Sequence, residues 1–257
     1  MADLSASYQP ENPGPDPWAS LKAHTAARIA LGRTGTSVPL REALAFRLAH
    51  AHARDAVYSI LNLEQLVPKL TQLAVSVCEV RSQAPDRQTY LQRPDLGRQL
   101  HGDSRILLQE QRADSFDLAV VLADGLSAEA VNEHAVPLLQ QLLPKLREAG
   151  FGVAPLVVAT QSRVAIGDEI GWVLGAQLSL VLIGERPGLS SPRSLGAYFT
   201  YGPRPGLTDE ARNCVSNIRP EGLNYDLAAD RLFFLLHESL RRKLSGVQLK
   251  DSSALLS

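Results

Sequence analysis

The apolar run from Leu118 to Ala123 is the feature that most limits how this chain can fold. It offers no polar side to solvent, so a strand built from it needs cover on both faces, as the central strands of parallel sheets have. A second short apolar strand, Leu178–Ile183, follows later in the chain, and helical segments separate the two. Strands that alternate with helices favour a parallel sheet between two layers of helices.

Other segments continue this alternation from about residue 73 onward. Strands are predicted at Ala74–Val80, Gly152–Val158 and Ala197–Tyr201. Helices are predicted from Ser127 to about Ala149, at Asp168–Leu174 and at Asp226–Leu244, with Ser127 and Asn224 as N-caps and with Pro137 and Pro144 restarting or kinking the first. We therefore expect an α/β fold, with a Rossmann-like parallel sheet and helices on both faces.

The first part of the chain differs in composition from the rest. Residues 1–15 combine prolines with polar residues, which is typical of a disordered arm. Asp16 and Pro17 begin a predicted helix that ends at Gly32, and a second helix is predicted from near Pro39. The sequence thus predicts an arm over 1–15, a helical region over 16–72 and a Rossmann-like domain over 73–257.

Composition excludes several classes of protein. A net charge of −1 argues against broad electrostatic binding to nucleic acid. The apolar runs are too short to span a bilayer, and the N-terminus lacks the pattern of a secretory signal. Cys78 and Cys214 lie far apart and form no zinc-ligand pair, which favours a reducing, cytoplasmic location. The six histidines also lack metal-ligand spacing, so we expect no protein-held metal.

The segment Gly184–Leu189 directly follows the second apolar strand, and its pattern Gly-x-Arg-Pro-Gly-Leu returns at Gly202–Leu207. Ligands of open α/β sheets bind at the carboxyl ends of strands, so Glu185 could accept a hydrogen bond there and Arg186 could bind a carboxylate of a partner. Two tight turns with solvated charges are the alternative reading. No phosphate-binding or dinucleotide glycine motif is present.

Two further residues have a structural and a functional interpretation. Asp124 ends the first apolar strand and could hold a ligand hydroxyl or amide, or bond only to the backbone of its own turn. Cys214 is more typical of a small packed side chain than of a nucleophile, because a nucleophile needs a histidine base and the sequence does not place His237 near it.

Four segments together resemble one known family. They are Leu91–Arg98, Ala123–Ser127, Gly184–Leu189 and Arg212–Pro220. In order and spacing the chain resembles, over residues 16 to 250, the small (light) subunit of ethanolamine ammonia-lyase. The resemblance implies a carbon–nitrogen lyase that converts ethanolamine to acetaldehyde and ammonia with adenosylcobalamin, by homolysis of the cobalt–carbon bond and removal of a substrate hydrogen by the adenosyl radical.

The resemblance also implies how the work is divided between chains. The large subunit, a TIM barrel, holds the substrate, and the small subunit closes over cobalamin at the interface, so this chain is active only with its partner. No catalytic residue is expected here. The residues that match cobalamin contacts are Val164, for packing, Glu185, for accepting hydrogen bonds from the cofactor's amides, and Cys214, for close packing or a backbone contact.

Other outcomes remain open at this point. A non-catalytic ligand-binding or assembly subunit is the alternative, and a stand-alone nucleotide-binding enzyme is a third reading that the missing glycine motifs disfavour. Some family members carry a longer N-terminal extension associated with enclosure in a bacterial microcompartment, whereas the arm here is short, so a cytoplasmic location with or without such enclosure stays open. No histidine lies in an Asp-x-His-x-x-Gly string, so we expect no cobalt ligand from this chain.

Overall fold

The computed structural model describes residues 16–114 and 116–250. The chain divides into two compact units, residues 1–52 and 53–257, which are described separately. The predicted arm over residues 1–15 lies outside the described residues. The predicted boundary between residues 72 and 73 stays a prediction.

The first unit contains less helix than the sequence predicts. The expected helix from Asp16 to Gly32 is wrong, because only a short 3-10 helix, Ala19–Ala23, forms there. Ala30 and Gly32 have left-handed backbone conformations, and Trp18 is 64% exposed, so little packing supports a longer helix. The predicted second helix is confirmed as α1, Leu40–Tyr58, which begins in this unit.

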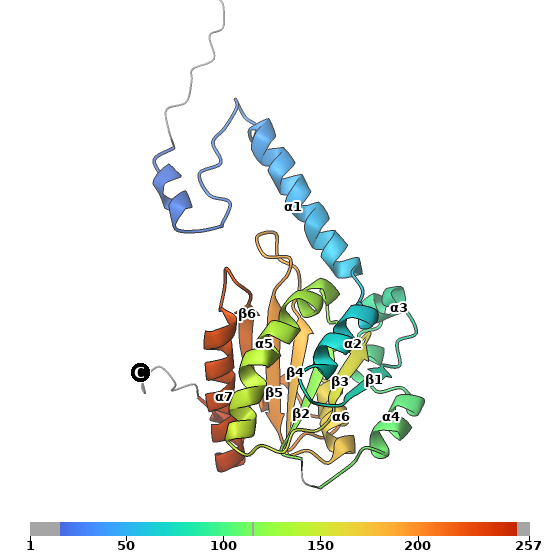
Figure 1. The fold of residues 1–257 in the computed structure, drawn as a ribbon. Helices are drawn as coiled ribbons and strands as arrows, with labels where there is room; N and C mark the ends of the chain where they lie inside the picture. The colour runs from blue at the N-terminus through green and yellow to red at the C-terminus, as the bar shows by residue number, and fades with distance from the viewer. Residues whose placement is uncertain (1–15, 115, 251–257) are drawn as a thin grey trace, which may run out of the picture. The chain divides into compact units, whose positions relative to one another are not determined.

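A six-stranded sheet forms the second unit, in the order β1-β3-β2-β4-β5-β6 (Figure 1). The strands are β1 Val77–Arg81, β2 Leu118–Ala123, β3 Leu156–Thr160, β4 Leu178–Gly184, β5 Leu195–Tyr201 and β6 Arg212–Ile218. The first four are parallel to one another, but β5 is antiparallel to both β4 and β6. The α/β class is therefore confirmed, whereas the purely parallel sheet is wrong, since the sheet is mixed.

The connection after β4 explains this difference. A parallel crossover needs about a dozen residues or more and usually a helix. The loop from Glu185 to Ser194 contains no helix and closes as a hairpin, with the N–H of Glu185 donating to the carbonyl of Ser194 at 2.9 Å. The structure also contains β6, Arg212–Ile218, which the sequence pattern does not predict, because polar residues interrupt its apolar positions.

Helices cover both faces of the sheet, as predicted (Figure 1). They are α2 Leu63–Thr71, α3 Arg87–Gln92, α4 Gly102–Gln109, α5 Ala128–Glu148, α6 Ile166–Leu174 and α7 Tyr225–Arg242. The core of one face joins α2, α5 and α7 to the sheet, and that of the other joins α4 and α6. On the second face β5 and β6 carry the half-buried Tyr198 and the exposed Cys214.

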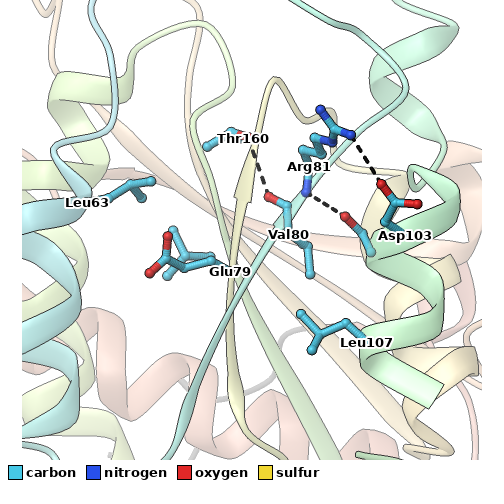
Figure 2. A pocket seen from close by; sticks show the side chains of 9 residues that line it. Leu63, Glu79, Val80, Arg81, Asp103, Leu107 and Thr160 are labelled. Atoms are coloured by element: carbon cyan, nitrogen blue, oxygen red, sulfur yellow. Dashed lines mark hydrogen bonds and ion pairs between the residues drawn. The ribbon is translucent and has the colours of Figure 1, made fainter. Parts of the chain in front are cut away.

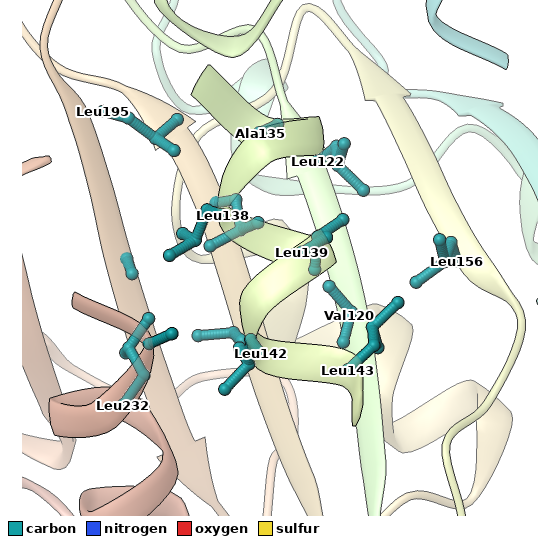
Figure 3. Packing of buried hydrophobic residues seen from close by; sticks show 14 of the residues in the cluster. Val120, Leu122, Ala135, Leu138, Leu139, Leu142, Leu143, Leu156, Leu195 and Leu232 are labelled. Atoms are coloured by element: carbon teal, nitrogen blue, oxygen red, sulfur yellow. The ribbon is translucent and has the colours of Figure 1, made fainter. Parts of the chain in front are cut away.

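Helix α5 is the centre of the larger core. Figure 3 shows its leucines inserted between the strands and α7, where Leu139 and Leu143 lie near Val120 of β2. Pro137 and Pro144 lie inside this helix, which continues through both. The expected side-chain cap by Ser127 is wrong, because its hydroxyl donates to the carbonyl of Pro192 at 3.1 Å. The loop after β4 is thereby tied to the start of α5.

Helix α7 begins as predicted. The side chain of Asn224 accepts a hydrogen bond from the N–H of Leu227 at 3.0 Å, so its role as N-cap is confirmed.

Candidate functional site

A cavity of about 410 Å³ lies at the carboxyl ends of the parallel strands. Its lining residues come from the segments after β2 and β3, from the end of β4 and the turn that follows it, and from α3 and β5: Tyr90, Gly125, Leu126, Arg163, Val164, Ile183, Gly184, Glu185, Arg186 and Tyr198. The segment after β2 leads to a helix on one face of the sheet, and the segment after β3 leads to a helix on the other. A place where neighbouring strands connect to helices on opposite faces is called a topological switch point. Open α/β sheets bind their ligands at such a point.

Glu185 is held in place by one of its two carboxylate oxygens. Its Oε2 accepts hydrogen bonds from the hydroxyl of Ser194 and, at 3.3 Å, from the N–H of Asn217. Among the described residues none donates a hydrogen bond to Oε1. The side chain therefore offers an oriented acceptor atom to a ligand in the cavity.

Close backbone contact fixes the turn that carries Glu185. A Cβ on Gly184 would lie 1.9 Å from the carbonyl oxygen of Ser127, and one on Gly125 would lie 2.3 Å from the carbonyl oxygen of Gly184. Both positions therefore need glycine. The end of β4 therefore packs directly against the turn after β2 at this wall of the cavity.

Arg163 and Tyr90 form another wall. The guanidinium of Arg163 lies over the Tyr90 ring, 4.4 Å from its centroid, and Arg87 lies 4.8 Å from the same centroid. The Tyr90 hydroxyl lies within hydrogen-bonding distance of the carbonyls of Gly125 and Ser162, at 2.9 and 3.1 Å. Sequence reasoning missed both residues, although Tyr90 adjoins a segment of the family resemblance and Arg163 precedes Val164.

The sequence allowed Asp124 either to hold a ligand or to bond to backbone, and the structure shows the second of these roles. Its carboxylate accepts hydrogen bonds from the backbone N–H groups of Gly125, Gln161 and Ser162 at 2.8–3.0 Å, and from Arg87 at 3.3 Å. Burial raises the pKa of this carboxyl, while the Ser162 N–H and the Arg87 charge oppose the rise. Asp124 joins the turn after β2 to the segment after β3.

The structure brings Val164 and Glu185 into one cavity and places Cys214 beside it. Cys214 lies opposite Tyr198 in the β5–β6 pair, and Tyr198 lines the cavity. Although Cys214 as a whole is exposed, partial desolvation of its thiol raises the pKa, and the Tyr198 hydroxyl partly offsets this rise. His237 lies on α7, which packs on the opposite face of the sheet, so it does not serve as a base for this thiol.

The second Gly-x-Arg-Pro-Gly-Leu turn does not join the site. It follows β5, which runs against β4, and the N–H of Gly202 donates to the carbonyl of Gln177 just before β4 begins. Gly202–Leu207 therefore lies at the end of the sheet where the parallel strands begin, and Gly184–Leu189 lies at the end where they finish.

A second, smaller cavity of about 290 Å³ surrounds the edge strand β1. Figure 2 shows Arg81 extended toward Asp103, with Leu63 and Glu79 apart from this pair. Arg81 and Asp103 lie 3.4 Å apart, and the N–H of Arg81 donates to the Ser104 hydroxyl at 3.0 Å. The cation of this cavity, Arg81, is thus paired with a carboxylate of the same cavity, unlike Arg163 in the first cavity.

Neither a metal site nor a membrane helix is found in the described part of the chain. Within it, no cluster of histidine, cysteine and acidic side chains could hold a metal ion, and no helix is long and apolar enough to cross a membrane. The buried His134 bonds to the Tyr225 hydroxyl at 2.9 Å and to the carbonyl of Arg193 at 3.1 Å. It supports the loop after β4.

The fold and the cavity define an α/β protein with a cavity at the carboxyl ends of its parallel strands. Over residues 15–250 the chain matches the family model described as ethanolamine ammonia-lyase light chain (EutC). The chain belongs to this family, which forms one of the two kinds of subunit of a lyase, so a large subunit is its implied partner.

Curated relatives agree over nearly the whole chain. An ethanolamine ammonia-lyase small subunit of Azotobacter vinelandii is 53% identical over 241 residues, which are 93% of this chain and 89% of the relative. Small subunits of Pseudomonas fluorescens and Pseudomonas syringae pv. tomato are 51% and 49% identical, over 93% and 99% of this chain and 88% and 90% of the relatives.

Proposed function

We propose that this chain forms one wall of an adenosylcobalamin site in an ethanolamine ammonia-lyase that converts ethanolamine to acetaldehyde and ammonia. The observation that carries the proposal is the cavity at the switch point, where Val164 and Glu185 meet beside Cys214. These are the three residues that the family resemblance assigns to the cofactor. Membership of the light-chain family supports the same assignment.

The chemistry of the cavity fits a corrinoid. A corrinoid carries carboxamide side chains around an apolar ring, and the cavity combines the free oxygen of Glu185 with the apolar side chains of Leu126, Val164 and Ile183. Glu185 would accept a hydrogen bond from a carboxamide, while Val164 would pack against the ring. Cys214, which lies beside Tyr198 in the β5–β6 pair, would pack against the cofactor next to the cavity.

The size of the cavity indicates a site shared with another chain. Its volume of about 410 Å³ lies near the lower end of pockets that enclose a drug-sized ligand, and adenosylcobalamin is far larger. This chain can therefore cover only part of the cofactor. When bound, the cofactor supplies the radical chemistry through its cobalt–carbon bond, and the residues here bind, orient and shield it.

The first unit offers a surface for the large subunit. Leu40, Leu44 and Leu48 repeat at four-residue intervals on α1 and are 73%, 53% and 58% exposed. A row of exposed leucines on one helix face marks a partner surface. We expect the isolated chain to self-associate through this row and to elute with the large subunit when both are present.

Co-expression with the large subunit tests the proposal. With added adenosylcobalamin and ethanolamine, the complex should release acetaldehyde, and each subunit alone should not. A control replaces Arg204, exposed at the opposite edge of the sheet, with methionine and should keep full turnover. A complex that assembles and binds no cobalamin would favour the alternative of a non-catalytic assembly subunit.

A further inference from the structure

Arg163 has the one guanidinium lining the cavity whose Nε is buried without any hydrogen-bond partner. Among the residues that the structure describes, none accepts a hydrogen bond from any nitrogen of this side chain. The neighbouring Arg87 also has one buried nitrogen without a partner, Nη2, but its Nε donates to the carbonyl of Val57 at 2.8 Å and its Nη1 to Asp124 at 3.3 Å. The charge of Arg87 is therefore compensated within the chain, whereas that of Arg163 is not.

The position of Arg163 is fixed in advance of any ligand. Its N–H donates to the carbonyl of Gly97 at 2.8 Å, its carbonyl accepts from the N–H of Ile166 at 3.0 Å, and its guanidinium lies over the Tyr90 ring, 4.4 Å from the centroid. A cation that is partly desolvated and held still without an acceptor is costly unless a ligand supplies one. The guanidinium thus has the properties of a preformed donor.

We propose that Arg163 donates a hydrogen bond to the carbonyl of a peripheral carboxamide of the cofactor, next to the contact already proposed for Glu185, and this inference rests on the proposed cobalamin site. A primary carboxamide has a carbonyl that accepts and an NH₂ that donates. Arg163 supplies the donor for the carbonyl, and the free Oε1 of Glu185 supplies the acceptor for the NH₂. The cofactor's phosphate is the competing acceptor for Arg163, since the cavity is also lined by Arg186, and the cobalamin derivatives described below distinguish the two.

Equilibrium binding of cyanocobalamin to the complex of both subunits tests this inference without turnover. Arg163→Met keeps an apolar stem over Tyr90 and removes all donors, so the dissociation constant should rise about ten- to a hundredfold. Arg163→Lys keeps the charge and loses the planar fork, so it should lie between this variant and the wild type. It also serves if the methionine variant does not assemble. Arg204→Met is the matched control and should bind like the wild type.

A second arm separates carboxamide from phosphate. In cobalamin monocarboxylic acids, one carboxamide is hydrolysed to a carboxylate and the phosphate is unchanged. At least one of them should bind the wild-type complex about tenfold or more weaker than cyanocobalamin does, because Glu185 repels it, and Glu185→Gln should remove most of that difference.

The outcomes distinguish this inference from the function beneath it. If the wild-type complex binds cyanocobalamin and Arg163→Met binds it equally well, the role of Arg163 is overturned and the site is not. If no monocarboxylic acid depends on Glu185, the carboxamide assignment is overturned. A wild-type complex that binds no cobalamin would overturn the proposed function, and this inference with it.

Discussion

The two Gly-x-Arg-Pro-Gly-Leu turns have the same pattern and opposite surroundings. Gly184–Leu189 follows a parallel strand and lines the cavity, whereas Gly202–Leu207 follows the antiparallel β5 and lies at the other edge of the sheet. In the first turn the x position is Glu185, with a free carboxylate oxygen, and in the second it is the buried Pro203. A local pattern therefore marks a turn, and only the direction of the preceding strand decides whether that turn reaches the site.

The two turns are also anchored differently. The loop that begins with the first turn is held by exposed ion pairs from Arg193 to Glu129 and Glu133, at 3.1 and 3.0 Å. The second turn is held by Arg212, which donates to the carbonyl of Leu207 at 3.1 Å and pairs with Asp168, and both charged side chains are 3% exposed. This contrast predicts where each turn tolerates change.

The largest expected effect is on stability and comes from the anchor of the second turn. Arg212→Ala leaves Asp168 buried without its cation and should lower the free energy of unfolding by about 3–5 kcal/mol. Arg193→Ala removes only exposed pairs and should cost less than about 1 kcal/mol. Urea unfolding of both variants measures the difference, and equal losses would contradict the contrast between the anchors.

The first glycine of each turn gives the next largest effect. Gly184→Ala places a Cβ against the carbonyl of Ser127 and should cost about 3 kcal/mol, since backbone cannot move aside easily. Gly202→Ala meets nothing within 4 Å but keeps a φ of +59°, so it should cost about 1 kcal/mol. Thermal unfolding of the pair compares them, and the reverse order would refute the close approach of the first turn.

A substitution in the first turn should weaken cofactor binding, whereas one in the second turn should not. Glu185→Ala removes the oriented acceptor and should weaken cobalamin binding to the assembled complex about ten- to a hundredfold, corresponding to about 1.5–3 kcal/mol. Its effect on turnover at saturating cofactor should be smaller. Arg204→Ala, in the second turn, is the control and should leave the dissociation constant unchanged. An unchanged constant for Glu185→Ala would contradict the proposed contact.

The smallest effect is expected at Cys214, beside the first turn. Partial desolvation raises the pKa of its thiol above the ordinary value, so the group stays protonated at neutral pH and is a poor nucleophile. Cys214→Ser should therefore keep most of the turnover. Cys214→Leu should be worse, because overpacking costs about 1–3 kcal/mol. Abolished turnover in the serine variant, with cofactor binding intact, would assign the thiol a chemical role.

Much of the fold followed from local pattern, and the misses have physical causes. The run at Leu118–Ala123 was predicted with its observed bounds because buried apolar residues leave few alternatives. The helix from Asp16 was wrong because capping signals do not stabilise a helix that lacks a surface to pack on. The strand at β5 was predicted but its antiparallel direction was not, because strand direction depends on the length of a loop and on pairing partners.

Some residues of the candidate site could be predicted from the sequence, and others could not. Glu185 was found from its place after an apolar strand and from the family resemblance, which also supplied Val164 and Cys214. Tyr90 and Arg163 were not found, because stacking between segments after different strands leaves no periodic trace in the sequence. Asp124 was left with two roles until four donors were seen around its carboxylate.

The sequence by itself determined the α/β class, the buried central strands, the family and the turn chemistry of both glycine-rich segments. These depend on residue type and on neighbours within a few positions, which a linear pattern records. The tertiary structure alone decided which turn faces the cavity, which carboxylate keeps a free oxygen and which arginine lacks an acceptor. Those properties depend on strand direction and on contacts between distant segments, because pairing and desolvation are set only when the chain is folded.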